Sequence, residues 1–205
     1  MNWKTEAMRL PLKEQWNKLY HIKLGNNFPG IWAHGDGKKN SEVLLQELPV
    51  MFKRYGIKSF LDCGCSNFFW MNNLNFPAMG VDYLGVDIVN EIIENNKTKY
   101  PGINFRCLNI VEEAPPESDM IFARSVFIHL KTKDILRALN NIKISGSKYL
   151  MASTSPEVES NRDTFSLMLV RRNLCMAPFN LPEPLEYVEE RCTPARRVVM
   201  GIWKL

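Results

Sequence analysis

Short apolar runs alternate with longer amphipathic stretches through the middle of this chain. The apolar runs are too short for helices and suit buried strands of a parallel sheet. We expect such strands at residues 59–61, 81–86, 103–108, 119–123 and 149–152. Strands that alternate with helices in this way predict an α/β fold with a parallel sheet and helices on both faces.

The amphipathic stretches repeat apolar residues at helical spacing. One is expected to begin at an N-cap, Ser41, and to stop at Gly56. A second covers residues 90–100 and stops at Pro101-Gly102, and a third is capped by Thr132 and broken by Gly146. The side chains expected to face the sheet are Leu44, Leu48, Met51, Phe52 and Tyr55, then Ile92 and Ile93, then Ile135, Leu136, Leu139 and Ile142. We also expect a short helix that Phe68, Phe69, Trp70 and Met71 open and that ends by Pro77.

Both ends of the chain depart from this alternation. Pro11 suits the start of a helix that runs to about residue 24. The glycine-rich stretch 25–37, which contains Trp32 and His34, is either a lid that closes on a ligand or a plain connector.

The stretch after the fifth expected strand is long and irregular. Residues 153–184 begin polar and contain four prolines, as expected of a segment that covers an active site. Residues 185–188 and 197–203 are expected to form two closing strands, antiparallel to each other. We interpret residues 1–205 as one domain, with an N-terminal helix and lid loop at 1–40 and a cover segment at 153–184.

Composition and charge exclude several classes of protein. The 26 basic and 22 acidic residues are interspersed, and the net charge of +4 is too small to argue for nucleic-acid binding, which calls for basic residues clustered on one face, although it does not exclude it. We find neither an apolar run of membrane-spanning length nor a signal peptide. The five cysteines are interpreted as reduced thiols, which places the protein in the cytoplasm. The spacing of cysteines and histidines does not suit a metal site.

The stretch that carries candidate chemistry is KSFLDCGCSNFFWM, residues 58–71. Asp62 closes the first expected strand, Gly64 follows it, and Asp87 closes the second strand 25 positions after Asp62. Residues that leave the carboxyl ends of parallel strands face the ligand in open α/β sheets. A carboxylate repels a pyrophosphate but attracts an ammonium or sulfonium group, so Asp62 favours S-adenosylmethionine over NAD. An acid at the position of Asp87 accepts hydrogen bonds from ribose hydroxyls.

The chain resembles the class I S-adenosylmethionine-dependent methyltransferases, and more narrowly a small bacterial and viral group of methyltransferase-domain proteins. The resemblance extends from near Trp32 to Trp203. It implies an α/β, Rossmann-like doubly wound sheet of about seven strands, mostly parallel with the last strand antiparallel. The residues that carry it are 61–65, Phe68, Trp70, Met71, 83–89, Arg124, His129, Leu130, 134–136, 145–150, Asn173, Leu174 and 178–182.

This resemblance implies a set of cofactor-binding residues. Asp62 would hold the methionine amine, Gly64 would let the backbone approach, and Asp87 would bind the ribose. Ile88, Asn109 and Ile110 would pack around the adenine. Arg124 and Ser125 would face the methyl-transfer site, where Arg124 either pairs with an anion or forms a structural ion pair. The complete set is Asp62, Cys63, Gly64, Cys65, Phe68, Asp87, Ile88, Asn109, Ile110, Arg124 and Ser125.

Four positions depart from the family pattern. Glycine is usual where Ser66 stands, and acids are common at Asn67, Asn109 and Ser125. Ser66 fits the turn if its φ is negative, whereas a positive φ would cost roughly 1 kcal/mol. The missing acids make the site less negative, which weakens its attraction for a cationic cofactor.

The expected activity is methyl transfer to a small acceptor such as a sugar or a phosphorylated metabolite, by in-line displacement. For a hydroxyl acceptor the candidate bases are His129 and His34, although His129 also suits a packed, hydrogen-bonded imidazole. The expected acceptor-binding residues are Trp32, Arg171, Arg172 and Phe179. A macromolecular acceptor, a non-catalytic cofactor-binding protein and a nicotinamide oxidoreductase are the alternatives. The missing glycines of the dinucleotide fingerprint count against the last.

Overall fold

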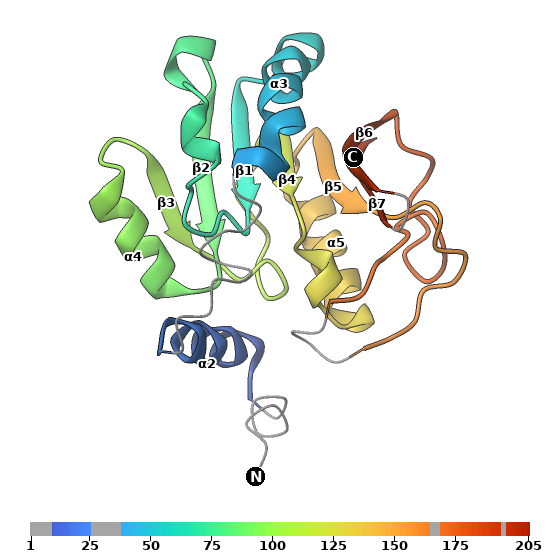
Figure 1. Cartoon of the computed structure of the whole chain (residues 1–205). Coiled ribbons are helices and arrows are strands. Elements are labelled where there is room, and N and C mark those ends of the chain that lie inside the picture. The colour runs from blue at the N-terminus through green and yellow to red at the C-terminus, as the bar shows by residue number, and fades with distance from the viewer. Residues whose placement is uncertain (1–9, 26–37, 165–168, 194–195) are drawn as a thin grey trace.

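The computed structural model describes residues 10–25, 38–164, 169–193 and 196–205. Within these ranges the chain forms one seven-stranded sheet in the order β3-β2-β1-β4-β5-β7-β6 (Figure 1). The strands are β1 Ser59–Cys63, β2 Asp82–Asp87, β3 Asn104–Cys107, β4 Met120–Ala123, β5 Tyr149–Thr154, β6 Glu186–Thr193 and β7 Arg196–Lys204.

The first five strands pair in parallel, whereas β7 pairs antiparallel to both β5 and β6. β6 therefore runs in the same direction as β1 to β5, and β7 alone opposes them. The predicted sheet, mostly parallel with the last strand antiparallel, is confirmed.

Helices cover both faces of this sheet, as predicted. The main helices are α2 Leu12–Gly25, α3 Lys38–Tyr55, α4 Asn90–Lys99 and α5 Thr132–Ile144. On one face, the stripe of α3 that contains Leu44 and Leu48 packs in the same buried cluster as Phe60 and Phe122 of the sheet. On the other face, Ile135, Ala138 and Ile142 of α5 pack with Leu61, Ile121 and Leu150. None of the helices in the described ranges is both long and apolar enough to cross a membrane.

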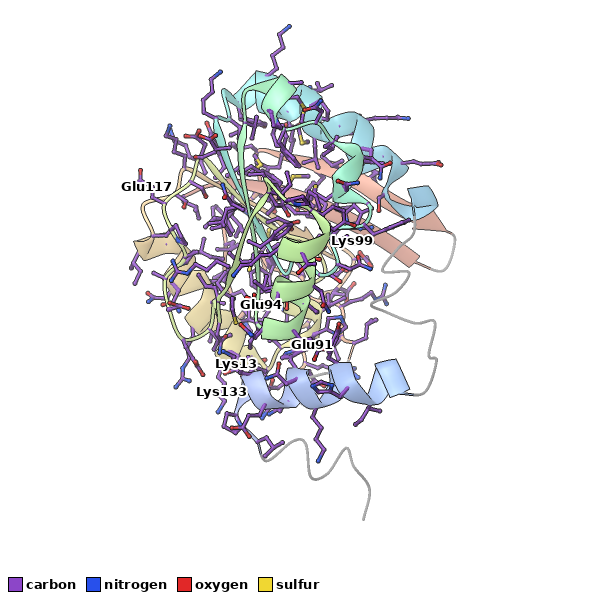
Figure 2. All side chains as sticks on the ribbon, turned by 90° about the vertical axis from the view of Figure 1, so that its left-hand side faces the viewer. Lys13, Glu91, Glu94, Lys99, Glu117 and Lys133 are labelled. Atoms are coloured by element: carbon purple, nitrogen blue, oxygen red, sulfur yellow. The ribbon has the colours of Figure 1, made fainter. Side chains whose placement is uncertain are left out.

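α2 lies outside these two layers, beside the end of α4 at which Glu91 lies (Figure 2). It crosses the end of the sheet toward which β1, β2 and β3 point (Figure 1). Trp16 and Leu19 of α2 are buried against Val89 and Ile92, which follow β2. The helix therefore covers the carboxyl edge of the sheet, where open α/β sheets bind their ligands.

Several local predictions were wrong. α3 begins at Lys38, so Ser41 is no N-cap but a fully buried residue inside the helix. Leu136 is 40% exposed, and the buried apolar face of α5 uses Ala138 instead. The helix expected to open at Phe68 is replaced by two short 3-10 turns, Met71–Asn73 and Pro77–Met79.

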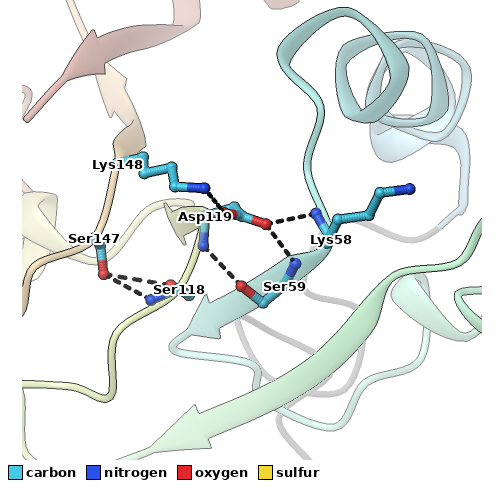
Figure 3. A network of polar contacts seen from close by, with 6 residues as sticks. All are labelled: Lys58, Ser59, Ser118, Asp119, Ser147 and Lys148. Carbon is cyan, nitrogen blue, oxygen red and sulfur yellow. Dashed lines mark hydrogen bonds and ion pairs between the residues drawn. The ribbon is translucent and has the colours of Figure 1, made fainter.

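The amino ends of three strands are joined through one carboxylate, that of Asp119 (Figure 3). Asp119 Oδ2 accepts hydrogen bonds from the backbone N–H groups of Lys58 (2.7 Å) and Ser59 (3.0 Å). Its Oδ1 accepts from Lys148 Nζ at 2.6 Å, and its own N–H donates to Ser59 Oγ at 2.8 Å. These contacts align the starts of β1, β4 and β5, and with them the register of the opposite, carboxyl edge.

Between β5 and β6 the described residues form turns and loops, without a helix. Two asparagines hold this segment together. Asn161 Nδ2 donates to the carbonyl oxygens of Asn173 (2.8 Å) and Ala177 (2.9 Å), and its Oδ1 accepts from the N–H of Asn173 (2.9 Å). Leu174 and Phe179 are buried in the same cluster as α5. The cover segment is therefore built into the core of that face.

Candidate functional site

The carboxyl ends of β1 and β2 meet in a tight loop that begins at Gly64. The N–H groups of Gly64 and Cys65 both donate to the carbonyl oxygen of Val86, at 2.8 and 3.0 Å. Gly64 has a φ of +78°, and a Cβ there would lie 2.8 Å from Val126 Cγ2. A side chain at position 64 is therefore excluded both by conformation and by contact.

Two residues after Gly64, the loop adopts left-handed conformations without glycine. Ser66 has a φ of +49° and Phe68 a φ of +56°. Of the two conformations considered for Ser66, the structure has the one with positive φ, so this residue carries the strain of about 1–2 kcal/mol that the left-handed region costs. Tertiary contacts hold it there, because Asn96 Nδ2 donates to Ser66 O at 2.6 Å and Ser66 N donates to Asp87 at 3.1 Å.

Asp87 organises this loop from the end of β2. Its Oδ2 accepts from the N–H of Ser66 and its Oδ1 from the N–H of Val89, at 3.0 Å. The side chain is buried. Burial raises the pKa of Asp87, and the hydrogen bonds from the N–H groups of Val89, Ser66 and Ile88 offset part of that rise. These backbone donors leave a carboxylate, with about four lone-pair sites, able to accept more hydrogen bonds.

Asp62, at the end of β1, is buried and faces the phenol of Tyr83. Tyr83 Oη donates to Asp62 Oδ2 at 2.7 Å. Burial is the main reason that the pKa of Asp62 is raised to about 7. The hydrogen bond from Tyr83 and the charge of Arg124 lower that pKa, and the charge of Asp87 raises it. Asp62 is thus a carboxyl group whose charge state changes near neutral pH.

Arg124 follows β4 and lies near Asp62, whose pKa it lowers. Its Nη1 donates to Ser41 Oγ at 3.1 Å, and its guanidinium lies 4.9 Å from the centroid of the Trp70 ring. This hydroxyl contact and the cation–π contact fix the arginine in place. Ser125, the next residue, has a φ of +57° and its N–H donates to Ser153 Oγ at 2.8 Å.

Asn109 follows β3 and is buried. Its Oδ1 accepts from the N–H of Val111 at 3.1 Å, whereas its Nδ2 donates to none of the described residues. A buried donor without an acceptor is costly, so this amide suits a ligand that supplies an acceptor. Ile110 is buried beside it, and Ile88 is half-buried where α2 packs. Cys63 and Cys65 are buried free thiols of the loop, and burial raises the pKa of each.

The two candidate bases differ in what the structure describes. His129 ends a 3-10 turn after β4, and the ring of Trp16 from α2 meets it edge-on at 5.6 Å between centroids. His129 therefore lies at the carboxyl edge beneath α2. His34 and Trp32 fall outside the described residues.

The remaining predicted acceptor-binding residues are on the cover segment, where they have different surroundings. Arg171 is exposed and paired with Glu157 at 2.7 Å. Arg172 is fully buried and donates to Leu130 O at 3.0 Å and to Arg162 O. Burial lowers the pKa of Arg172. Phe179 packs in the core beside α5. The structure thus does not gather these three side chains around one point.

The cover segment nevertheless reaches the candidate base. The N–H of Val170 donates to Ile128 O at 2.8 Å, and Arg172 binds the carbonyl of Leu130. Residues 170–172 therefore lie beside the turn that contains His129. Together with α2, they flank the carboxyl edge from two sides.

Sequence reasoning missed the contacts that Tyr83, Asn96, Trp70 and Trp16 make with this site. The resemblance to the methyltransferases includes Tyr83 and Trp70 but implies no role for either. The only trace of these residues in the sequence was their place along the chain. Trp16 lies within the helix predicted to begin near Pro11, and helical spacing alone gives no partner for its side chain.

No protein-family model matches the sequence, and no curated protein matches it either. Solved structures do match the fold. A magnesium protoporphyrin IX methyltransferase from Synechocystis, solved with bound S-adenosylmethionine, is 12% identical, with a TM-score of 0.66 over 95% of this chain and 97% of that one.

Two further solved structures match the same fold. The methyltransferase domain of bacterial CtHen1-C is 13% identical, with a TM-score of 0.61 over 81% of this chain and 98% of that one. A SAM-dependent methyltransferase from Leishmania major is 15% identical, with a TM-score of 0.61 over 82% of this chain and 74% of that one. The chain therefore has the fold of the class I S-adenosylmethionine-dependent methyltransferases.

Proposed function

We propose that this protein transfers the methyl group of S-adenosylmethionine to a small acceptor. The observation that carries the proposal is the pair of buried carboxylates, Asp62 and Asp87, at the ends of adjacent strands on either side of the Gly64 turn. The solved relative with bound S-adenosylmethionine has the same fold, which supports this choice of cofactor. A carboxylate pair at this edge suits an ammonium group and ribose hydroxyls, and opposes a pyrophosphate.

The described residues fit this cofactor in four respects. Asp62 supplies a negative charge for the methionine ammonium. Asp87 retains acceptor capacity for ribose hydroxyls beyond its bonds to the backbone. Asn109 supplies a buried, unpaired amide donor where the resemblance expects adenine, whose ring nitrogens are acceptors. Gly64 lets the backbone approach because a Cβ would have no room.

The bound cofactor would supply a methyl carbon already activated by the sulfonium. The work of the chain is then alignment and exclusion of water. α2 and residues 170–172 flank the edge where the acceptor would lie. For a hydroxyl acceptor, we assign the role of base to His129, which lies at this edge under Trp16.

We favour a small acceptor over a macromolecule. Basic and acidic residues are nearly balanced in number, so the chain lacks the charge excess of a nucleic-acid-binding protein. The porphyrin methyltransferase of similar fold acts on a small molecule by its name. We also place the protein in the cytoplasm, since the four cysteines with described side chains are free thiols. We further propose that residues 1–205 form a single domain.

A cofactor-binding protein without catalysis is the second candidate. It is favoured by Ser66, Asn67, Asn109 and Ser125, which replace the glycine and acids usual in the family. Binding with no transfer to any acceptor in a labelled-methyl screen of metabolite and RNA extracts would select this candidate.

The test of the proposed function is a thermal-shift comparison of S-adenosylmethionine, S-adenosylhomocysteine and NAD. A ligand at ~100 times its dissociation constant stabilises the native state by about 2.7 kcal/mol. We expect a shift with both adenosyl compounds and none with NAD. Asp87→Asn should remove the shift, whereas Asp82→Asn, at the exposed opposite end of β2, should leave it unchanged. A shift with NAD alone would contradict the proposal.

A further inference from the structure

Tyr83 reaches Asp62 across two neighbouring strands. In the register of β1 and β2, Tyr83 lies opposite Phe60, and Gly85 lies opposite Asp62. A Cβ at position 85 would lie 2.9 Å from Tyr83 Oη. The glycine therefore leaves the space through which the phenol contacts Asp62 Oδ2 at 2.7 Å.

The ring of Tyr83 is held by the aromatic core. It lies 4.6 Å from the ring of Phe76 and 5.0 Å from that of Phe68, between centroids. Phe60 and Phe105 contact it at 6.2 Å. Since Tyr83 is only 5% exposed, its hydroxyl is fixed before any ligand arrives. Preorganised donors of this kind cost no rearrangement on binding.

We propose that Tyr83 is a positioning residue for cofactor binding: its hydroxyl occupies Oδ2 of Asp62 and so directs Oδ1 toward the ammonium group of S-adenosylmethionine. This inference rests on the proposed function and goes beyond it, because it assigns a role to a residue that would not itself touch the cofactor. Tyr83 would act entirely through the carboxylate.

The charges around Asp62 determine how this role can be measured. Tyr83 and Asp87 face it from β2, and Arg124 from the loop after β4. Cys63 and Cys65 carry thiols with raised pKa values, so they stay neutral in the range of the experiment. Burial raises the pKa of Asp62 to about 7, and the bond from Tyr83 opposes that rise. One hydrogen bond to a charged group corresponds to roughly one to two pKa units.

The proposal therefore predicts a particular pH dependence. Below the pKa of Asp62, affinity for a ligand with an ammonium group should fall about tenfold per pH unit, because only ionised Asp62 attracts it. The amino group of S-adenosylhomocysteine stays largely protonated across the range of the experiment, because its own carboxylate stabilises the ammonium. The affinity of the wild type should thus level off above the pKa of Asp62. Without the hydroxyl of Tyr83, the acid limb should move to higher pH.

The experiment is isothermal titration of S-adenosylhomocysteine into wild type, Tyr83→Phe and Tyr100→Phe between pH 6.0 and 8.5. Tyr100→Phe is the matched control, since Tyr100 packs 5.0 Å from Phe68 in the same aromatic cluster. We expect Tyr83→Phe to weaken binding about tenfold or more at pH 6.0 but only about twofold at pH 8.5. Tyr100→Phe should follow the wild type throughout.

A purely structural role of Tyr83 would weaken binding by the same factor at every pH, and that result would overturn the inference. An acid limb moved equally by Tyr100→Phe would overturn it too. Asp62→Asn provides a second route if Tyr83→Phe does not fold, because it should abolish the acid limb; an acid limb that persists in Asp62→Asn contradicts the inference. Failure of the wild type to bind at any pH would instead refute the proposed function.

Discussion

Removing the Asp119 carboxylate tests whether the amino ends of β1, β4 and β5 are held by one side chain. In Asp119→Ala, the N–H groups of Lys58 and Ser59 lose their acceptor, and Lys148 loses its partner. A partly buried donor left without an acceptor costs about 1–3 kcal/mol. The two backbone donors together give an expected loss of roughly 2–4 kcal/mol, since water can replace part of what is lost. For a chain of 205 residues, that lowers Tm by about 4–16 °C.

The same contacts set the sign of the pH dependence. Partial burial alone would raise the pKa of Asp119, but the hydrogen bonds from Lys148 and the two backbone N–H groups lower it below its ordinary value. A lowered pKa in the folded state means stability that is present above the unfolded pKa of about 3.9 and lost as the pH falls through the folded value. The difference between wild type and Asp119→Ala should therefore be full at pH 7 and should shrink below pH ~4.

The assay is thermal unfolding followed by circular dichroism at pH 7 and pH 3. Lys148→Met is the matched control. It removes only an ion pair whose lysine is 64% exposed, so its effect should be much smaller than that of Asp119→Ala. Equal effects of the two variants would refute the reasoning, because they would give the stabilisation to the ion pair. A difference between wild type and Asp119→Ala that is the same at both pH values would also refute it.

Three other variants test single features. Ser66→Gly relieves the left-handed strain but enlarges the unfolded ensemble, so we expect a net stabilisation of about 0–1.5 kcal/mol. Urea unfolding measures it, and a clear destabilisation would contradict the strained conformation of Ser66. Trp16→Ala removes the main contact of α2, so amide hydrogen exchange in α2 should rise sharply while β1 and β4 stay protected. Unchanged exchange in α2 would show that Trp16 does not hold this helix against the sheet. Arg172→Met leaves two carbonyl oxygens without their donor, so the free energy of unfolding should fall by roughly 1–3 kcal/mol. Limited proteolysis should then cut the cover segment faster, and unchanged cleavage would contradict the role given to Arg172.

The sheet was predictable because its strands leave a direct trace in the sequence. A strand buried on both faces requires a continuous apolar run, and β4 is buried at all four positions. The stop signals also held, since Gly56 ends α3 with a φ of +65°. The buried face of α5 was predicted less well. Leu136 and Ala138 both fit a helical stripe, and only packing against the sheet decides which of them is buried.

The cover segment could not be predicted for a physical reason. Side-chain N–H groups donate hydrogen bonds to carbonyl oxygens of the cover segment and of the adjoining turn. The donors are Asn161, Asn173 and Arg172. Such residues usually lie on the surface, so their identity indicated a solvent-facing loop or a ligand contact. Only the folded structure shows that these side-chain hydrogen bonds hold together a segment that has no helical backbone hydrogen bonds.

Some residues of the candidate site could be identified from the sequence, and others could not. Asp62, Gly64 and Asp87 were identifiable because each stands at the end of a strand or in the turn that follows it. The roles of Ser66 and Tyr83 depend on contacts between segments. Ser66 keeps a positive φ because Asn96 and Asp87 bind its backbone, and Tyr83 contacts Asp62 only because of the register between β1 and β2. Spacing along the chain contains neither fact.

The most direct test of the proposed site is a crystal structure of the protein grown with S-adenosylhomocysteine. The account predicts that the ribose hydroxyls bind Asp87, that the amino group faces Asp62, and that the adenine lies beside Asn109 and Ile110. A nucleoside found away from the carboxyl ends of β1 and β2, or an amino group that faces away from Asp62, would contradict it.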